Sequence, residues 1–366
     1  MGKTIFITLL IILTYLLLWP VPVDPVNWHA PEDQGYVDDF EQNTLLQQIE
    51  TLKISGAHGP EALAILGDEL YASTREGWII RHNPINGEIK NWVHTNGSPL
   101  GLAFDHNNNL LVADAYRGLL HISAAGEITT LTTRIDGSAT QQPAINYADD
   151  VDVAADGKIY FSDASTKFGA QANGGTYQAS LLDILEHGGH GRLLVYNPND
   201  QSTKILMQGL NFANGVALAE DSSFVLVVET GSYRVHKYWL EGNQAGQSEI
   251  IVDNLPGFPD NIVRGENGRF WIGLVAPRNT LVDALSNHRF LRVVIQRFPT
   301  FMRPAAQHYG HVIAIDAQGQ VLHSLQNPEG NYHTNTGALE VGDWLYISSL
   351  HADNLGRISK AKAGIQ

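Results

Sequence analysis

After its first fifty residues, the chain alternates short apolar runs with turns rich in Gly, Asn and Asp. Residues 62–66 are apolar and are followed by Gly67-Asp-Glu and a second run at 70–73, and the same pattern recurs at 215–218 and 224–229. Such pairs predict β-hairpins, because Gly and Asx residues favour the tight turns that join two strands. The pairs begin near residues 61, 101, 149, 214, 260 and 338, and further strand-like runs follow most of them.

Six repeats of about four strands predict an all-β fold, a six-bladed β-propeller. The spacing of the repeats is uneven, so two of them must contain insertions. Residues 164–190 include a short amphipathic helix at 180–186, and residues 280–308 have helical spacing of apolar residues, so we expect short helical insertions at the mouth of the propeller. A strand near residues 51–55 is expected to complete the last blade and close the ring.

The N-terminal residues have the pattern of a membrane segment. Residues 4–23 contain no charge and are mostly Ile, Leu, Val and Thr, which is enough to span a bilayer as a transmembrane helix. Lys3 precedes the segment and Asp24 follows it, so the predicted topology is single-pass with the propeller on the periplasmic (extracytoplasmic) side. A cleaved signal peptide and secretion are the alternative, but Pro20-Val-Pro-Val-Asp lacks an Ala-x-Ala-like site. The predicted domains are an anchor at 1–23, a linker at 24–50 and the propeller at 51–366.

Composition narrows the possible partners. The formal charge of −15 argues against nucleic acid. The absence of cysteine excludes disulfides and thiolate metal sites. Within this acidic chain, residues 281–303 are basic, with arginines at 289, 292, 297 and 303. This insertion is either a helical lid on the propeller mouth or a basic amphipathic contact with anionic membrane lipid, and the two are compatible.

Oxygen-bearing residues recur at the start of the repeats. The set comprises Glu61, Asp149, Asp150, Asn214, Asp260 and Asn261. Groups at one point of radially arranged blades converge on the axis, and hard oxygen donors there predict a calcium site. The alternative is that each residue only caps a turn and bonds backbone.

Several stretches are similar to the strictosidine synthase-like proteins, which belong to a wider six-bladed group with the gluconolactonase-type lactonases and the paraoxonases. The similarity includes Asp-Gly-Lys-Ile-Tyr-Phe-Ser-Asp from Asp156 and Phe-Ala-Asn-Gly-Val-Ala-Leu from Phe212. It extends over residues 55–357, with the matching segments at 101–105, 111–120, 156–165, 190–194, 212–218, 224–230 and 255–262.

The resemblance implies a function for the axial residues. It assigns an axial Ca²⁺ to Glu61, Asp149, Asn214, Asp260 and Asn261, and it makes Asp260 the candidate catalytic base of a calcium-dependent hydrolase. The expected substrate is a small-molecule ester or lactone in the central cavity, and Asp150 is expected to support the ligands from behind.

Two departures from the family pattern limit this assignment. Thr336 falls where strictosidine synthase has its catalytic glutamate, so strictosidine synthesis is not expected. The strand end at 113–116 has no counterpart of the paraoxonase histidine pair. A non-catalytic propeller that is stabilised by calcium and binds a partner or lipid is therefore the alternative.

Overall fold

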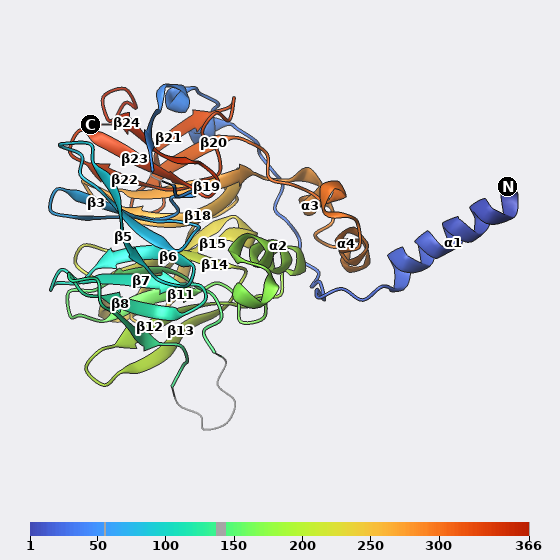
Figure 1. Ribbon diagram of the computed structural model, residues 1–366, viewed down its shortest axis with the longest axis horizontal. Helices are drawn as coiled ribbons and strands as arrows, with labels where there is room; N and C mark the ends of the chain where they lie inside the picture. The colour runs from blue at the N-terminus through green and yellow to red at the C-terminus, as the bar shows by residue number, and fades with distance from the viewer. Residues whose placement is uncertain (55, 137–143, 366) are drawn as a thin grey trace.

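The computed structural model describes residues 1–54, 56–136 and 144–365 (Figure 1). In these ranges the strands form six four-stranded antiparallel sheets. The innermost strand of each sheet contacts the innermost strands of the two neighbouring sheets, so the six sheets form a closed ring. The predicted all-β six-bladed propeller is therefore confirmed.

Each of the first three blades has its innermost strand first in the sequence. The strands are β2 (Leu63–Leu66), β3 (Glu69–Ser73), β4 (Trp78–His82) and β5 (Ile89–His94) in blade 1; β6 (Pro99–Phe104), β7 (Leu110–Asp114), β8 (Gly118–Ile122) and β9 (Ile128–Thr132) in blade 2; β10 (Ala148–Val153), β11 (Ile159–Asp163), β12 (Gly191–Asn197) and β13 (Ser202–Leu210) in blade 3.

The remaining blades follow the same order, except that the outer strand of blade 6 comes from the N-terminal side of the ring. The strands are β14 (Ala213–Leu218), β15 (Phe224–Glu229), β16 (Arg234–Trp239) and β17 (Ser248–Val252) in blade 4; β18 (Gly257–Arg264), β19 (Phe270–Pro277), β20 (Gly310–Ile315) and β21 (Val321–Asn327) in blade 5; β22 (Asn335–Val341), β23 (Trp344–Ser349), β24 (Asn354–Ser359) and β1 (Glu50–Lys53) in blade 6.

The predicted closing strand is β1. It pairs with β24 in antiparallel register, with Thr51 opposite Gly356 and Leu52 opposite Leu355. The pairing joins the two ends of the ring, so the last blade is completed by the segment that precedes the first. Ser55, the last residue of the predicted strand, lies outside the described residues.

Helices occur where the repeat spacing predicted insertions. The blade 3 insertion contains η3 (Gln171–Asn173) and α2 (Thr176–Glu186), so the helix predicted at 180–186 begins four residues earlier, at Thr176. The blade 5 insertion contains α3 (Thr280–Ala284), α4 (Arg289–Gln296) and η6 (Thr300–Met302). Two further 3₁₀ turns, η4 (Thr230–Ser232) and η5 (Gly242–Gln244), lie in blade 4.

The N-terminal segment forms α1 (Gly2–Leu18), a 17-residue apolar helix that projects away from the insertions (Figure 1). Among the described residues, none of the helices reaches the length and apolarity needed to cross a membrane. The predicted transmembrane helix is therefore present as a helix but is not confirmed as a membrane span.

The segment between α1 and β1 packs against the propeller. Val23 is 6% exposed and lies in an apolar cluster with Tyr147 and Phe212. The Trp28 ring stacks on His187, with centroids 3.8 Å apart. Two 3₁₀ turns, η1 (Asp38–Phe40) and η2 (Leu45–Gln48), then contact β21. The segment predicted as a linker therefore runs as a strap along the insertions and blade 5.

Candidate active site

Several of the predicted axial residues lie in a β-bulge near the start of an innermost strand. The strand registers shift by the same step in β6, β10, β14, β18 and β22, and in three of them the step includes Asp149, Asn214 and Asp260. A β-bulge turns side chains out of the regular alternation and often occurs beside functional sites. In β10, β14 and β18 the bulged residues Asp149, Asn214 and Asp260 all line the central cavity.

Hydrogen bonds join these residues in pairs between different blades. Asn214 Nδ2 donates to Asp260 Oδ1, which links blades 4 and 5. Asn261 Nδ2 donates to the backbone oxygen and to Oε1 of Glu61, at 3.1 and 3.0 Å. Thr336 Oγ1 also donates to the Glu61 backbone oxygen, at 2.6 Å. The structure thus brings Glu61, Asn214, Asp260 and Asn261 together.

Asp149 and Asp150 are neighbours in sequence but point in different directions. Asp149 lines the cavity described below. Asp150 instead accepts hydrogen bonds from the backbone N–H groups of Val216 (2.8 Å) and Val151 (2.9 Å). The Asp150 side chain therefore ties blade 3 to blade 4, which is a positioning role behind the axial residues.

The axial acids are buried close to one another. Burial raises the pKa of Glu61 well above its usual range, and the Asp260 charge raises it further. Burial has the same effect on the pKa of Asp149, to which Glu61 and Asp260 add. Burial raises the pKa of Asp260 to about 7, although the hydrogen bond from Asn214 acts in the opposite direction. Like charges in a desolvated site favour binding of a cation.

Three buried oxygen atoms of this set have no hydrogen-bond partner within the part of the chain that the structure describes. They are Glu61 Oε2, Asn214 Oδ1 and Asn261 Oδ1. Buried polar atoms are nearly always paired, so such atoms require an explanation. Their hard oxygen chemistry fits Ca²⁺ or another divalent cation.

Among the residues that the structure describes, no three His, Asp or Glu side chains form a preassembled metal cluster. The three axial carboxylates, Glu61, Asp149 and Asp260, therefore do not form such a cluster in this structure, and the donor set also includes the amide oxygens of Asn214 and Asn261.

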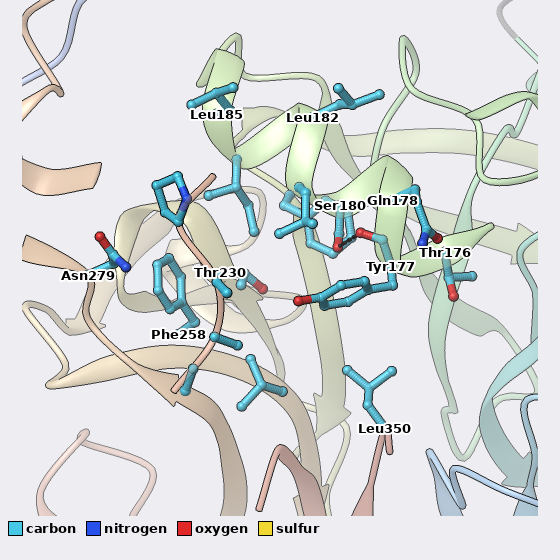
Figure 2. A pocket seen from close by; sticks show the side chains of 18 of the residues that line it. Thr176, Tyr177, Gln178, Ser180, Leu182, Leu185, Thr230, Phe258, Asn279 and Leu350 are labelled. Atoms are coloured by element: carbon cyan, nitrogen blue, oxygen red, sulfur yellow. Dashed lines mark hydrogen bonds between the residues drawn. The ribbon is translucent and has the colours of Figure 1, made fainter. Parts of the chain in front are cut away.

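The axial residues form the floor of a cavity of about 610 Å³. Glu61, Asp149, Asn214 and Asp260 line it, whereas Asn261 lies behind them toward the opposite end of the channel. The walls are mostly apolar. Figure 2 shows the rings of Tyr177, from α2, and Phe258, from β18, both directed into the cavity, with Leu350 of blade 6 nearby.

Three of the four aromatic residues that line this cavity in the described part of the chain share a sequence pattern that sequence reasoning missed. Tyr147, Phe212 and Phe258 all line it, and each lies two positions before an axial donor. Tyr147 and Phe212 directly precede β10 and β14, and Phe258 lies near the start of β18, so all three occupy the same end of their blades as the donors. The sequence therefore contained a signal for them, an aromatic residue at the same offset in three repeats. Pro22 also lines the cavity, and no sequence pattern indicated it.

Comparison with known proteins places this architecture in a family. The family described as strictosidine synthase matches residues 149–243, and the one described as strictosidine synthase-like, N-terminal, matches residues 38–82. The adipocyte plasma membrane-associated protein of Bos taurus is 32% identical over 370 residues, which cover 94% of this chain and 86% of that protein. The chain belongs to the strictosidine synthase-like family. Another family member, strictosidine synthase-like protein 6 of Arabidopsis thaliana, is 32% identical over 325 residues, or 87% of this chain and 83% of that protein.

Solved structures share the fold of this family member at lower sequence identity. A gluconolactonase from Xanthomonas campestris has a TM-score of 0.61 at 16% identity and covers 85% of this chain and 88% of that one. The calcium-binding protein regucalcin from Agrobacterium tumefaciens has a TM-score of 0.55 at 13% identity, and the match covers 83% of this chain and 93% of regucalcin. These similarities show a common propeller fold.

Proposed function

We propose that this protein is a calcium-dependent hydrolase that cleaves a small ester or lactone in the central cavity. One observation above all supports the proposal. Buried axial oxygens from several blades form the floor of a cavity large enough for a small organic substrate, and two of the residues there, Glu61 and Asn214, each have an oxygen without a partner among the described residues. The gluconolactonase named above has the same fold, which makes a lactone a reasonable first substrate to test.

The five axial residues would hold the cation through their side-chain oxygens. When bound, a divalent cation supplies positive charge that polarises the substrate carbonyl. Asp260 is the proposed general base. Because Asn214 donates to Asp260 Oδ1, the carboxylate is fixed in orientation and Oδ2 is left to accept a proton from the attacking water. Thr336 holds the Glu61 backbone in place and has no acidic group, so amine–aldehyde condensation is not proposed.

A second function, a non-catalytic propeller in which the cation is structural, is favoured by one feature of the site. The amide groups of Asn214 and Asn261 each bond a neighbouring axial residue, so a bound cation would join blades 1, 4 and 5 even without catalysis. In that case the cavity would bind a partner or lipid without turnover.

We also propose that α1 attaches the protein to a membrane, with the propeller on the extracytoplasmic side. The support is the uncharged sequence at 4–23 and the order of Lys3 and Asp24 around it. The bovine relative is named a plasma membrane-associated protein, which agrees with this proposal.

Turnover by the full-length chain in detergent tests the hydrolase. We expect activity on a panel of aryl esters and lactones to require calcium, to stop with chelator, and to be lost in Asp260→Asn and Asn214→Ala. Asp152→Asn is the matched control, since Asp152 lies in the same kind of strand but accepts from the Leu218 N–H away from the cavity. Activity that persists with chelator and in Asp260→Asn would refute the hydrolase mechanism. A calcium-dependent rise in melting temperature without any turnover would favour the structural cation.

A further inference from the structure

In α4 of the blade 5 insertion, one arginine and two apolar side chains have an inverted arrangement. Arg292, in α4, is only 1% exposed, whereas Phe290 and Leu291 beside it are 57% and 43% exposed. In a water-facing helix the apolar side chains are buried and the charged ones exposed. The inversion indicates that the outer side of this insertion faces something other than water.

Hydrogen bonds explain why the Arg292 guanidinium is inside. It donates to the backbone oxygens of Leu185 (2.9 Å) and Ser286 (3.0 Å), and to that of Val26. A buried guanidinium is tolerated when most of its donors are satisfied, and here both terminal nitrogens donate while Nε has no partner among the described residues. Arg292 thus joins α2, the strap and the α3–α4 turn, and it fixes the orientation of α4. The exposed position of Phe290 and Leu291 is therefore a built feature of the insertion.

The exposed apolar residues continue beyond α4. We define the outer face of the insertion as Leu281, Phe290, Leu291, Phe301 and Met302. Phe301 is 86% exposed, Met302 55% and Leu281 48%. Single exposed apolar residues are ordinary, but several large ones on one short insertion mark an interaction surface.

The apolar helix α1 contacts this same insertion at its C-terminal end and projects away from it. Arg297, just after α4, donates to the backbone oxygens of Trp19 (2.6 Å) and Leu16 (2.8 Å), at the C-terminal end of α1. Tyr15 donates in turn to the Arg297 backbone oxygen at 3.0 Å. Figure 1 shows α3 and α4 on the side of the propeller from which α1 projects. The outer face and α1 therefore form neighbouring apolar surfaces.

The inner side of the insertion lines the cavity, through Ile295, Gln296 and Thr300. The outer face thus lies beside the cavity mouth. Cations occur at its edges, because Arg289 is 54% exposed along its side chain, where it pairs with the 81% exposed Asp24, and Arg303 lines the mouth. In a chain with a net charge of −15, local arginines at an apolar face favour an anionic lipid surface.

We propose that the outer face of the blade 5 insertion docks onto the surface of a lipid bilayer that contains anionic headgroups. The apolar side chains enter the boundary between headgroups and acyl chains, and Arg289 and Arg303 contact the phosphates. Docking then directs the cavity mouth toward the membrane, so that an apolar substrate dissolved in the bilayer can enter directly. This last consequence rests on the proposed hydrolase, but the docking does not.

Site-specific labels can test docking separately from attachment by α1. The chain has no cysteine, so Phe290→Cys and Phe301→Cys each provide one labelling position in the full-length protein. Ile85→Cys is the matched control, because Ile85 is an 80% exposed apolar residue in the β4–β5 turn. That turn joins the third and fourth strands of its blade, so it lies at the opposite end of the propeller from the β19–β20 insertion.

Each variant is labelled with an environment-sensitive dye and mixed with phosphatidylcholine vesicles, with or without phosphatidylglycerol. We expect blue-shifted emission and quenching by acyl-brominated lipid at positions 290 and 301 but not at 85. The shift should be larger with phosphatidylglycerol and should shrink in Arg289→Gln/Arg303→Gln. Labels at 290 and 301 that remain in water would overturn the proposal. A shift before vesicles are added would also overturn it, since a second copy would then cover the face. None of these readings depends on turnover.

Discussion

At the scale of single residues, the axial site combines too much negative charge with too few hydrogen bonds. The Asp260 charge raises the pKa of Glu61, and the charges of Glu61 and Asp260 raise the pKa of Asp149. Glu61 Oε2 and Asn214 Oδ1 have no hydrogen-bond partner among the described residues. Both features are unfavourable without a cation and favourable with one. The effect of a substitution at the site should therefore change sign with calcium.

Asp149→Asn tests this reversal. Without calcium, we expect the variant to melt at a higher temperature than the wild type, because one buried carboxyl beside Glu61 and Asp260 is neutralised. With calcium, the variant should be the less stable protein, and its calcium affinity should fall by about 10- to 100-fold. Thermal denaturation and calorimetric titration of chelator-treated protein measure the two effects. A variant that is less stable under both conditions would contradict the cation site.

Glu340 allows a pH prediction away from this site. Burial alone would raise its pKa, but hydrogen bonds from Arg269 (2.9 Å) and Trp271 (2.7 Å) and the Lys360 contact outweigh burial and lower the pKa to about 2. A depressed pKa adds stability above the unfolded-state pKa, and this contribution is lost as pH falls toward the folded value. Glu340→Gln should therefore lower the unfolding free energy by about 3 kcal/mol at pH 7. The difference should shrink between about pH 4.5 and 2, as denaturant melts at several pH values would show. A difference that is constant with pH would exclude the ionic explanation.

At the scale of elements, alternation and turns predicted the strands, but not the bulges within them. The repeat starts expected at 61, 149 and 214 lie within two residues of β2, β10 and β14, because hairpin strands are encoded locally. The convergence of the axial residues also followed from their equal place in each repeat. The residue pattern alone did not separate Asp150 from Asp149, because the bulge between Ala148 and Val151 decides which carboxylate faces the cavity. The different expectations for the two residues came from the family resemblance, and of the two it is Asp149 that lines the cavity.

The glycine after the axial residue provides a test of how tightly these bulges pack. A Cβ on Gly215 would lie 2.4 Å from Ile262 N and 2.7 Å from Asn261 C, which are backbone atoms that cannot move aside. Gly337 occupies the same place after Thr336, and there the nearest atom would be Asn261 Cβ at 3.4 Å. We expect Gly215→Ala to lower the free energy of unfolding by about 1–3 kcal/mol or more, and Gly337→Ala to lower it much less. Chemical denaturation of both variants measures the two losses of unfolding free energy. Equal losses would contradict the tight packing inferred around Gly215.

At the scale of the whole molecule, contacts between distant segments were the part that the sequence did not reveal. Closure by β1 was predictable, since a six-bladed ring needs a last strand. The packing of the strap was not predictable, because residues 24–50 have the composition of a linker. Their contacts are made by a few individual residues and follow no repeating pattern. Trp28 stacks on His187, and the Val26 N–H donates to the Glu186 backbone oxygen at 2.8 Å. Three segments that are far apart in the chain thus form the roof of the cavity: the strap, the α2 insertion of blade 3 and the blade 5 insertion.

Arg292 is the side chain that joins all three segments of this roof. Arg292→Met keeps an apolar stem of similar length but removes the bonds to Leu185, Val26 and Ser286. We expect limited proteolysis to cut the 280–308 insertion and the strap much faster than in the wild type, while the melting temperature of the propeller changes little. The cavity mouth would then open, so KM for an apolar ester should rise more than kcat falls. Arg289→Met is the control, because among the described residues Arg289 bonds the exposed Asp24 carboxylate alone, an interaction worth about 0–1 kcal/mol. Unchanged proteolysis in Arg292→Met would show that the roof is held by apolar packing instead of by this guanidinium.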